Sequence, residues 1–122
     1  MWIERLVPMN THPLASLDRE VALARVGGDP ELLKEIAVLF LENYQAWVGE
    51  VREAWASGNA DAVQRAAHGL KGSVANFGAR DAVEASLKLE TLGRNRDLTG
   101  MPESMAALEA ALETLRGDLE SL

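Results

Sequence analysis

Three residues near the middle of the chain have types and a spacing that could support chemistry: His68, Lys71 and Gly72. An imidazole exposed to water is mostly uncharged at neutral pH, so one ring nitrogen offers a lone pair to an electrophile. A phosphoryl group is such an electrophile, and its transfer depends mainly on positioning and charge stabilisation. On a helix, Lys71 would lie beside the imidazole and supply positive charge, although alone it would fit an ordinary solvated lysine. Gly72, one turn after the histidine, would leave room for the incoming group.

The helical wheel places His68 on the outer face of its helix. With Leu70 of the core stripe set at zero, His68 lies at about 160° and Gly72 at about -160°. On the wheel alone, His68 still fits an ordinary surface histidine. Gly69 and Gly72 change this interpretation, because each glycine costs about 1 kcal/mol relative to alanine inside a helix. Close packing between helices would be another reason for Gly72, but this residue does not face the core.

Other polar and small residues share this outer face or border it. Gln64, Arg65 and Ala75 lie outward with the histidine, whereas Ser73 lies at about -60°, at the boundary of the core. The Ser73 hydroxyl either bonds back to a helical carbonyl or helps to orient the histidine.

Glycine, proline and capping residues divide the chain into a short helix and four longer ones. The short helix is expected at residues 13–25, and the longer ones at 30–56, 60–75, 79–92 and from Pro102 onward. Asp29 and Asn59 fit helix N-caps, and Gly78 fits a tight turn after the third of these five helices. Apolar residues recur at helical spacing, and the expected core positions are Leu33, Ile36, Phe40, Tyr44, Trp47, Val51, Val63, Ala66, Ala67, Leu70, Val74, Phe77, Ala82, Val83, Ser86, Leu89, Met105, Leu108, Leu112, Leu115 and Leu119.

These elements predict an all-α fold. Short connections between long amphipathic helices favour antiparallel neighbours, so we expect an up-down-up-down antiparallel four-helix bundle with a short additional N-terminal helix. Residues 1–12 are expected to be an N-terminal tail, and residues 13–122 to be one helical bundle domain.

Composition excludes several classes of function. The 122 residues contain 12 Lys+Arg, 19 Asp+Glu and no Cys, for a net charge of -7. This acidic balance argues against nucleic-acid and membrane binding, which favour basic surfaces. Without cysteine there is no disulfide or thiolate site, and the two histidines, His12 and His68, are too few for a His-rich metal site. We therefore expect no metal, no cofactor and, without a signal peptide or membrane span, a cytoplasmic monomer.

The segment around the histidine resembles a known motif. Residues 67–79 read Ala-His-Gly-Leu-Lys-Gly-Ser-Val-Ala-Asn-Phe-Gly-Ala. They are similar to the motif of the histidine-containing phosphotransfer (HPt) domain family, His-x-Leu-Lys-Gly-Ser followed by a Gly-Ala turn. Further similarities at residues 17–29, 31–40 and 89–90 extend the resemblance over about residues 14 to 120.

This resemblance implies a phosphorelay intermediate in two-component signal transduction, not an enzyme in the ordinary sense. His68 would accept a phosphoryl group from a receiver-domain aspartate or a histidine kinase and pass it to the receiver aspartate of a response regulator. Lys71 would offset phosphate charge, Gly72 would admit the phosphoryl group and the partner, and Gln64 and Ser73 would be supporting contacts. Any magnesium would belong to the receiver. The chain has no Gly-rich nucleotide loop, so we expect no autokinase activity.

The expected partners are receiver domains of response regulators and a sensor or hybrid histidine kinase. They would dock on the outer face around Arg65, Gly69 and Ala75, where small residues leave the surface flat. Val38 would extend this surface, since it lies about 160° from Phe40 and should be exposed; it could equally be a stray surface valine.

Two other functions remain open from the sequence. The chain could be a non-catalytic helical adaptor in which His68 is incidental. It could also be the phosphoacceptor substrate domain of a chemotaxis-type kinase, with the ATP-binding domain elsewhere.

Overall fold

The computed structural model describes residues 17–122, and the predicted tail at residues 1–12 lies outside this part of the chain. All regular structure in the described residues is helical, which confirms the prediction of an all-α fold. The helices are α2 (Arg19–Arg25), α3 (Pro30–Ala56), α4 (Ala60–Ala75), α5 (Arg80–Arg94) and α6 (Met101–Glu120).

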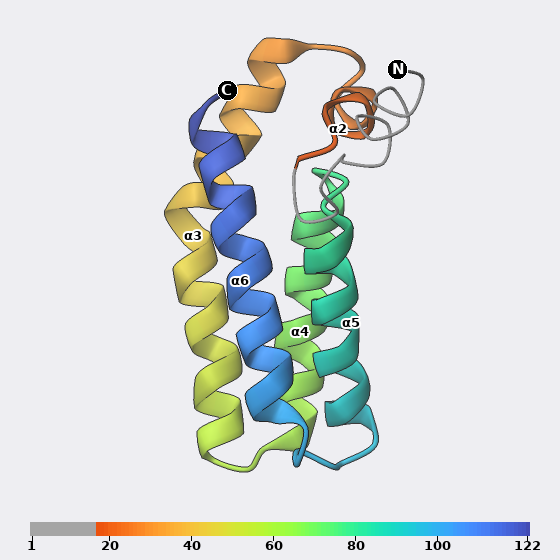
Figure 1. Ribbon diagram of the computed structural model, residues 1–122, viewed down its shortest axis with the longest axis vertical. Helices are drawn as coiled ribbons and strands as arrows, with labels where there is room; N and C mark the ends of the chain where they lie inside the picture. The colour runs from red at the N-terminus through yellow and green to blue at the C-terminus, as the bar shows by residue number, and fades with distance from the viewer. Residues whose placement is uncertain (1–16) are drawn as a thin grey trace, which may run out of the picture.

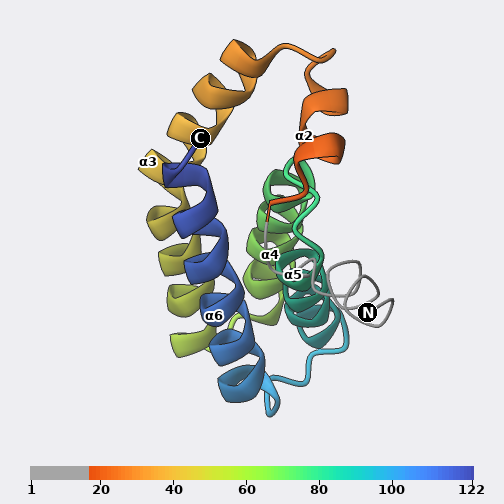
Figure 2. The ribbon, with the colours of Figure 1, turned by 45° about the horizontal axis from the view of Figure 1, so that its top comes forward.

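The four long helices lie side by side (Figure 1). In that view α3 runs down, α4 up, α5 down and α6 up, so each runs opposite to its neighbours in the sequence. Packing occurs between α3 and α4, α4 and α5, α5 and α6, and α3 and α6, which closes a ring of four helices. The short α2 crosses the end of the molecule where α3 begins and where α4 passes into α5 (Figure 2).

Side-chain caps explain where α3 and α4 begin. The side chain of Asp29 accepts hydrogen bonds from two backbone N–H groups of the first turn of α3, and Asn59 caps α4 through the N–H of Ala62. Gly78 has a φ of 64°, a left-handed conformation that glycine adopts without strain, and it forms the predicted turn after α4.

Three helices differ from the prediction at one or both ends. Residues 17 and 18 are not helical, because Asp18 is the N-cap of α2 and accepts from the N–H of Val21; residues 13–16 of the predicted helix lie outside the described part. The helix predicted from Pro102 onward is α6, and it begins one residue earlier, because the first turn of a helix tolerates proline. The helix predicted at 79–92 is α5, which spans Arg80–Arg94 and has Ala79 as its N-cap.

The core follows the predicted stripes with one systematic difference. Of the predicted core residues, Ile36, Trp47, Ala66 and Val83 are only half-buried, and they pack against the edge of the core. Smaller residues of α3, Ala37, Val48 and Ala54, are buried in addition. Near the α2 end, the Phe40 ring stacks on Tyr44 and meets Phe77 edge-on, with ring centroids 5.2 and 5.4 Å apart.

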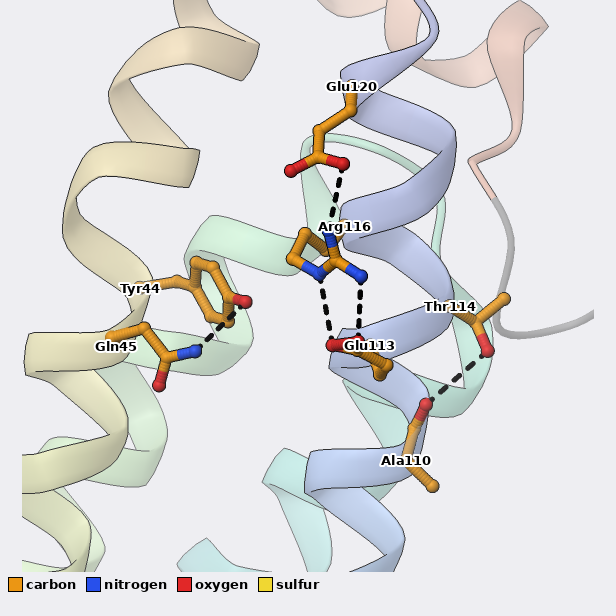
Figure 3. A network of polar contacts seen from close by, with 7 residues as sticks. All are labelled: Tyr44, Gln45, Ala110, Glu113, Thr114, Arg116 and Glu120. Carbon is orange, nitrogen blue, oxygen red and sulfur yellow. Dashed lines mark hydrogen bonds and ion pairs between the residues drawn. The ribbon is translucent and has the colours of Figure 1, made fainter.

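Exposed ion pairs lie on the surface of α6 (Figure 3). Arg116 donates to both carboxylate oxygens of Glu113, at 3.0 and 2.7 Å, and to Glu120 at 2.8 Å. The two carboxylates raise the pKa of Arg116, with Glu113 contributing most. Such pairs add little to stability because solvent screens them.

Within residues 17–122, every helix is too short or too polar to cross a lipid bilayer.

Candidate functional site

His68 lies in the middle of α4, and its side chain is 68% exposed. This is the outward position that the helical wheel predicts. The ring is accessible along one edge while the other edge has a protein partner. The site therefore presents a reactive group to solvent without burying it.

The partner of His68 is a carboxylate from the neighbouring helix. Nδ1 of His68 lies 2.9 Å from Oε2 of Glu90 on α5, and the Glu90 side chain is only 6% exposed. A buried carboxylate thus contacts the ring from the side of the bundle interior. Because its position is set by packing, it restricts the orientation of the imidazole.

Two further cations meet the same carboxylate. Nζ of Lys71 lies 2.8 Å from Oε1 of Glu90, and Nη2 of Arg94 lies 3.2 Å from Oε2. Lys71 holds the pKa of Glu90 below its usual value of 4.5 through its hydrogen bond; burial opposes this effect, and His68 adds to it. Glu90 is therefore ionised at neutral pH, as a buried carboxyl with several donors should be.

This arrangement determines which ring nitrogen of His68 is free. An ionised carboxylate only accepts hydrogen bonds, so Nδ1 must carry the proton that it donates to Glu90. In the neutral ring the lone pair then resides on Nε2. The structure thus favours one tautomer, in which Nδ1 carries the proton and Nε2 carries the lone pair.

The glycines beside His68 leave open space. A Cβ atom built on Gly69 or on Gly72 would meet no heavy atom within 4 Å apart from its immediate surroundings in the helix. Both residues are exposed. Next to them, Asp61, Gln64 and Arg65 line a shallow surface hollow together with His68 and Glu90. A group bound at Nε2 would therefore have room on this face.

Of the other predicted site residues, Gln64 and Arg65 lie beside the ring in this hollow. Ser73 donates its hydroxyl to the carbonyl of Gly69 at 3.3 Å, which is the first of the two roles considered for it, a hydrogen bond back to a helical carbonyl. Ala75 is half-buried near the end of α4. Val38 is 51% exposed, and the shallow hollow beside it is lined by residues of α3 alone, without His68.

Sequence reasoning missed Glu90 and Arg94 as parts of the site. The helical wheel of α5 contained a signal for the first. With Leu89 at zero, Ser86 lies at about 60°, Glu90 at about 100° and Val83 at about 120°. A carboxylate inside a core-facing stripe needs a donor on the neighbouring helix. Arg94, one turn later, then follows as a residue able to reach that carboxylate.

Residues 17–122 contain no group of three or more His, Cys, Asp and Glu side chains that could hold a metal ion.

Comparison with known proteins identifies the family. The sequence model of the Hpt domain matches residues 35–118, which is more than half of the chain, so the chain belongs to the Hpt domain family. Members of this family are phosphotransfer intermediates of two-component signalling, not classical enzymes.

A solved structure has the same fold. Histidine-containing phosphotransfer protein B (HptB) from Pseudomonas aeruginosa PAO1 aligns with a TM-score of 0.80 and 21% sequence identity. The alignment covers 86% of this chain and 91% of that protein. No curated protein sequence matches the chain significantly.

Proposed function

We propose that His68 is the phosphoacceptor of a phosphorelay. It takes a phosphoryl group from a receiver-domain aspartate or a histidine kinase and passes it to the aspartate of a response-regulator receiver. The observation that carries this proposal is the hydrogen bond between Nδ1 of the exposed His68 ring and the buried carboxylate of Glu90. This bond leaves the Nε2 lone pair free at the surface.

The transfer step follows from this tautomer. The Nε2 lone pair attacks the phosphorus of the phospho-aspartate, a nitrogen–phosphorus bond forms, and the phosphorus–oxygen bond to the aspartate breaks. The aspartate leaves as a carboxylate with the electron pair of that bond. The imidazole keeps its Nδ1 proton and becomes positively charged, and the carboxylate of Glu90 stabilises this charge. The reverse sequence returns the phosphoryl group to another receiver.

Lys71 and Gly72 would support the step in different ways. Lys71 is held on the same carboxylate as the ring, so its ammonium group would lie near a phosphoryl group on Nε2 and would offset the negative charge of that group. Gly72 leaves the approach to the ring unobstructed. Gln64 and Ser73 are proposed as supporting contacts; the Ser73 hydroxyl would act through the Gly69 carbonyl that it already meets.

Partners would dock on the outer face of α4. Arg65 and Gly69 lie on this face next to the ring, and Ala75 extends it toward the end of the helix. Val38 lies farther away, so it would contact only a partner that reaches over α3. We take the protein to be a monomeric, up-down-up-down antiparallel four-helix bundle over residues 13–122, following a tail at 1–12.

The test is phosphotransfer to the full chain. A panel of receiver domains from the same organism, each carrying a radiolabelled phospho-aspartate, is mixed with wild type, His68→Gln and His12→Gln. We expect acid-labile, base-stable label on wild type and His12→Gln, and none on His68→Gln. Label that survives His68→Gln, or no label from any receiver or histidine kinase, would contradict the proposal.

Adding a histidine kinase with ATP as a second donor, and ATP alone, separates the two alternatives. A non-catalytic adaptor acquires no label from any donor. A chemotaxis-type substrate domain acquires label from a kinase with ATP but exchanges none with receivers that serve a relay. The chain alone with ATP should remain unlabelled, because we expect no autokinase activity.

A further inference from the structure

Gly93 lies where α5 packs directly against the backbone of α4. It is buried on α5, one turn after Glu90. A Cβ atom at this position would lie 2.6 Å from the backbone nitrogen of Gln64 and 2.7 Å from the carbonyl oxygen of Ala60. Both atoms belong to the backbone of α4 and cannot move aside as the tip of a flexible side chain could. Only glycine therefore permits this spacing of the two helices.

The close approach is in register with the functional site. Gln64 precedes His68 by one helical turn on α4, and Gly93 follows Glu90 by nearly one turn on α5. The contact that Gly93 permits is thus adjacent to the contact between Nδ1 of His68 and Oε2 of Glu90. The spacing of the helices at the first contact sets the reach of the carboxylate at the second.

The distances show how little tolerance this arrangement has. Relieving the clash to an ordinary contact of 3.4 Å would move the helices apart by about 0.8 Å at Gly93. The His68–Glu90 hydrogen bond is 2.9 Å long, and stretching it by that amount takes it beyond hydrogen-bonding distance. The enclosed Glu90 side chain, 6% exposed, has little freedom to follow the ring.

We infer that Gly93 is a positioning residue for the phosphoacceptor: it holds α5 against α4 so that Glu90 reaches Nδ1 of His68 and selects the tautomer with a free Nε2. This inference rests on the proposed function of His68 but concerns a property of the ring that exists without phosphate. If Gly93 has this role, replacing it changes which ring nitrogen of His68 carries the proton. A purely structural glycine would affect stability and leave the ring unchanged.

The experiment measures the tautomer of His68 directly. Nitrogen-15 NMR of the full chain records the ring nitrogens at a pH where the imidazole is neutral, in a His12→Gln background that leaves only His68 in the spectrum. The variants are Gly93→Ala and the matched control Gly117→Ala, a helical glycine on α6 where a Cβ atom meets nothing within 4 Å. Each is also made together with Glu90→Gln, and circular dichroism verifies the fold.

We expect the Nδ1–H tautomer to dominate in the parent and in Gly117→Ala. In Gly93→Ala its population should fall at least about threefold toward the mixture of a free imidazole. In the Glu90→Gln background, Gly93→Ala should add little, because the contact through which it acts is already altered.

Three results would overturn the inference. The first is a folded Gly93→Ala with the tautomer of the parent, and the second is an equally large effect of Gly93→Ala in the Glu90→Gln background. The third is a failure of Gly93→Ala to fold even when Gly49→Ala and Gly117→Ala, at two unobstructed helical positions, are added to stabilise it; Gly93 would then serve the fold as a whole. None of these readouts uses phosphotransfer, so the role of Gly93 can be refuted while the proposed function of His68 still holds.

Discussion

The carboxylate of Glu90 reaches Nδ1 of His68 at 2.9 Å from inside the bundle, while the ring itself is mostly exposed. The carboxylate is enclosed and charged, and the ring is accessible and polarised by it. The packing of α4 against α5 places Glu90 at Nδ1, and it therefore determines which ring nitrogen of His68 keeps a free lone pair.

Replacing Glu90 by glutamine should slow phosphotransfer. The amide can still accept a hydrogen bond from Nδ1, but it lacks the negative charge that stabilises the phosphorylated, positively charged ring. We expect a loss of about 10- to 100-fold, by analogy with the effect of altering carboxylates that orient metal-binding histidines. Rapid-quench measurement of transfer from a phosphorylated receiver checks this, with Glu113→Gln on α6 as the control for loss of a surface carboxylate. A wild-type rate in Glu90→Gln would show that the charge has no role.

The stability of the protein should depend on pH through Glu90. Its folded pKa lies below the usual 4.5, chiefly because of Lys71, so its ionised form stabilises the fold. This contribution is fully present above the unfolded pKa and is lost as the pH falls below about 4.5 through the lowered folded value.

Urea unfolding across the acidic range tests this dependence. The free energy of unfolding of wild type should fall more steeply below about pH 4.5 than that of Glu90→Gln, and the two curves should run parallel above about pH 6. Glu113→Gln, which removes an exposed carboxyl whose pKa Arg116 also lowers, should change the slope less because solvent screens that pair. Parallel curves for wild type and Glu90→Gln throughout the acidic range would refute a stabilising Glu90.

Lys71→Ala should slow transfer and leave the fold intact. The substitution removes the cation proposed to offset phosphate charge, and we expect a loss of about 10- to 100-fold, somewhat less than for a fully enclosed donor. It also removes the main cause of the lowered pKa of Glu90, so stability at neutral pH should fall by about 1–3 kcal/mol. Stopped-flow transfer assays and urea unfolding measure the two effects. Unchanged transfer would remove the role assigned to Lys71.

Gly72→Gln should separate stability from function. Its side chain meets open space in the free protein, so the helix should become more stable by up to about 1 kcal/mol. The same side chain would occupy the approach to the His68 ring and should reduce transfer at least about tenfold. Gly117→Gln on α6, where the space is equally open, should show the stabilisation alone. Normal transfer by Gly72→Gln would show that the open space at Gly72 is not needed for access to His68.

The sequence predicted the helices well because their boundaries are local. The bounds of α3 and α4 match the expected 30–56 and 60–75. Asp29 and Asn59 cap the first turns of these helices, and Gly58, with a φ of 67°, forms the turn between them. The core stripes were also largely predictable from spacing. Trp47 is half-buried because its large ring extends beyond the core edge, a detail that helical spacing does not contain.

The sequence was less informative about contacts between helices. His68 and Lys71 share one helix, so their neighbourhood follows from spacing. Glu90 comes from another helix, and its partners depend on the register of α4 against α5. Gly93 was missed for the same reason, because the atoms that exclude a Cβ there belong to the backbone of α4.

The proposed role of His68 is tested by identifying the atom that carries the phosphoryl group. The full chain, labelled with nitrogen-15, is phosphorylated with phosphoramidate and observed by phosphorus and nitrogen NMR. We expect a phosphoryl group on Nε2 of His68, with Nδ1 still protonated and hydrogen-bonded to Glu90. A phosphoryl group on Nδ1, or a protein that carries none on His68, would contradict it.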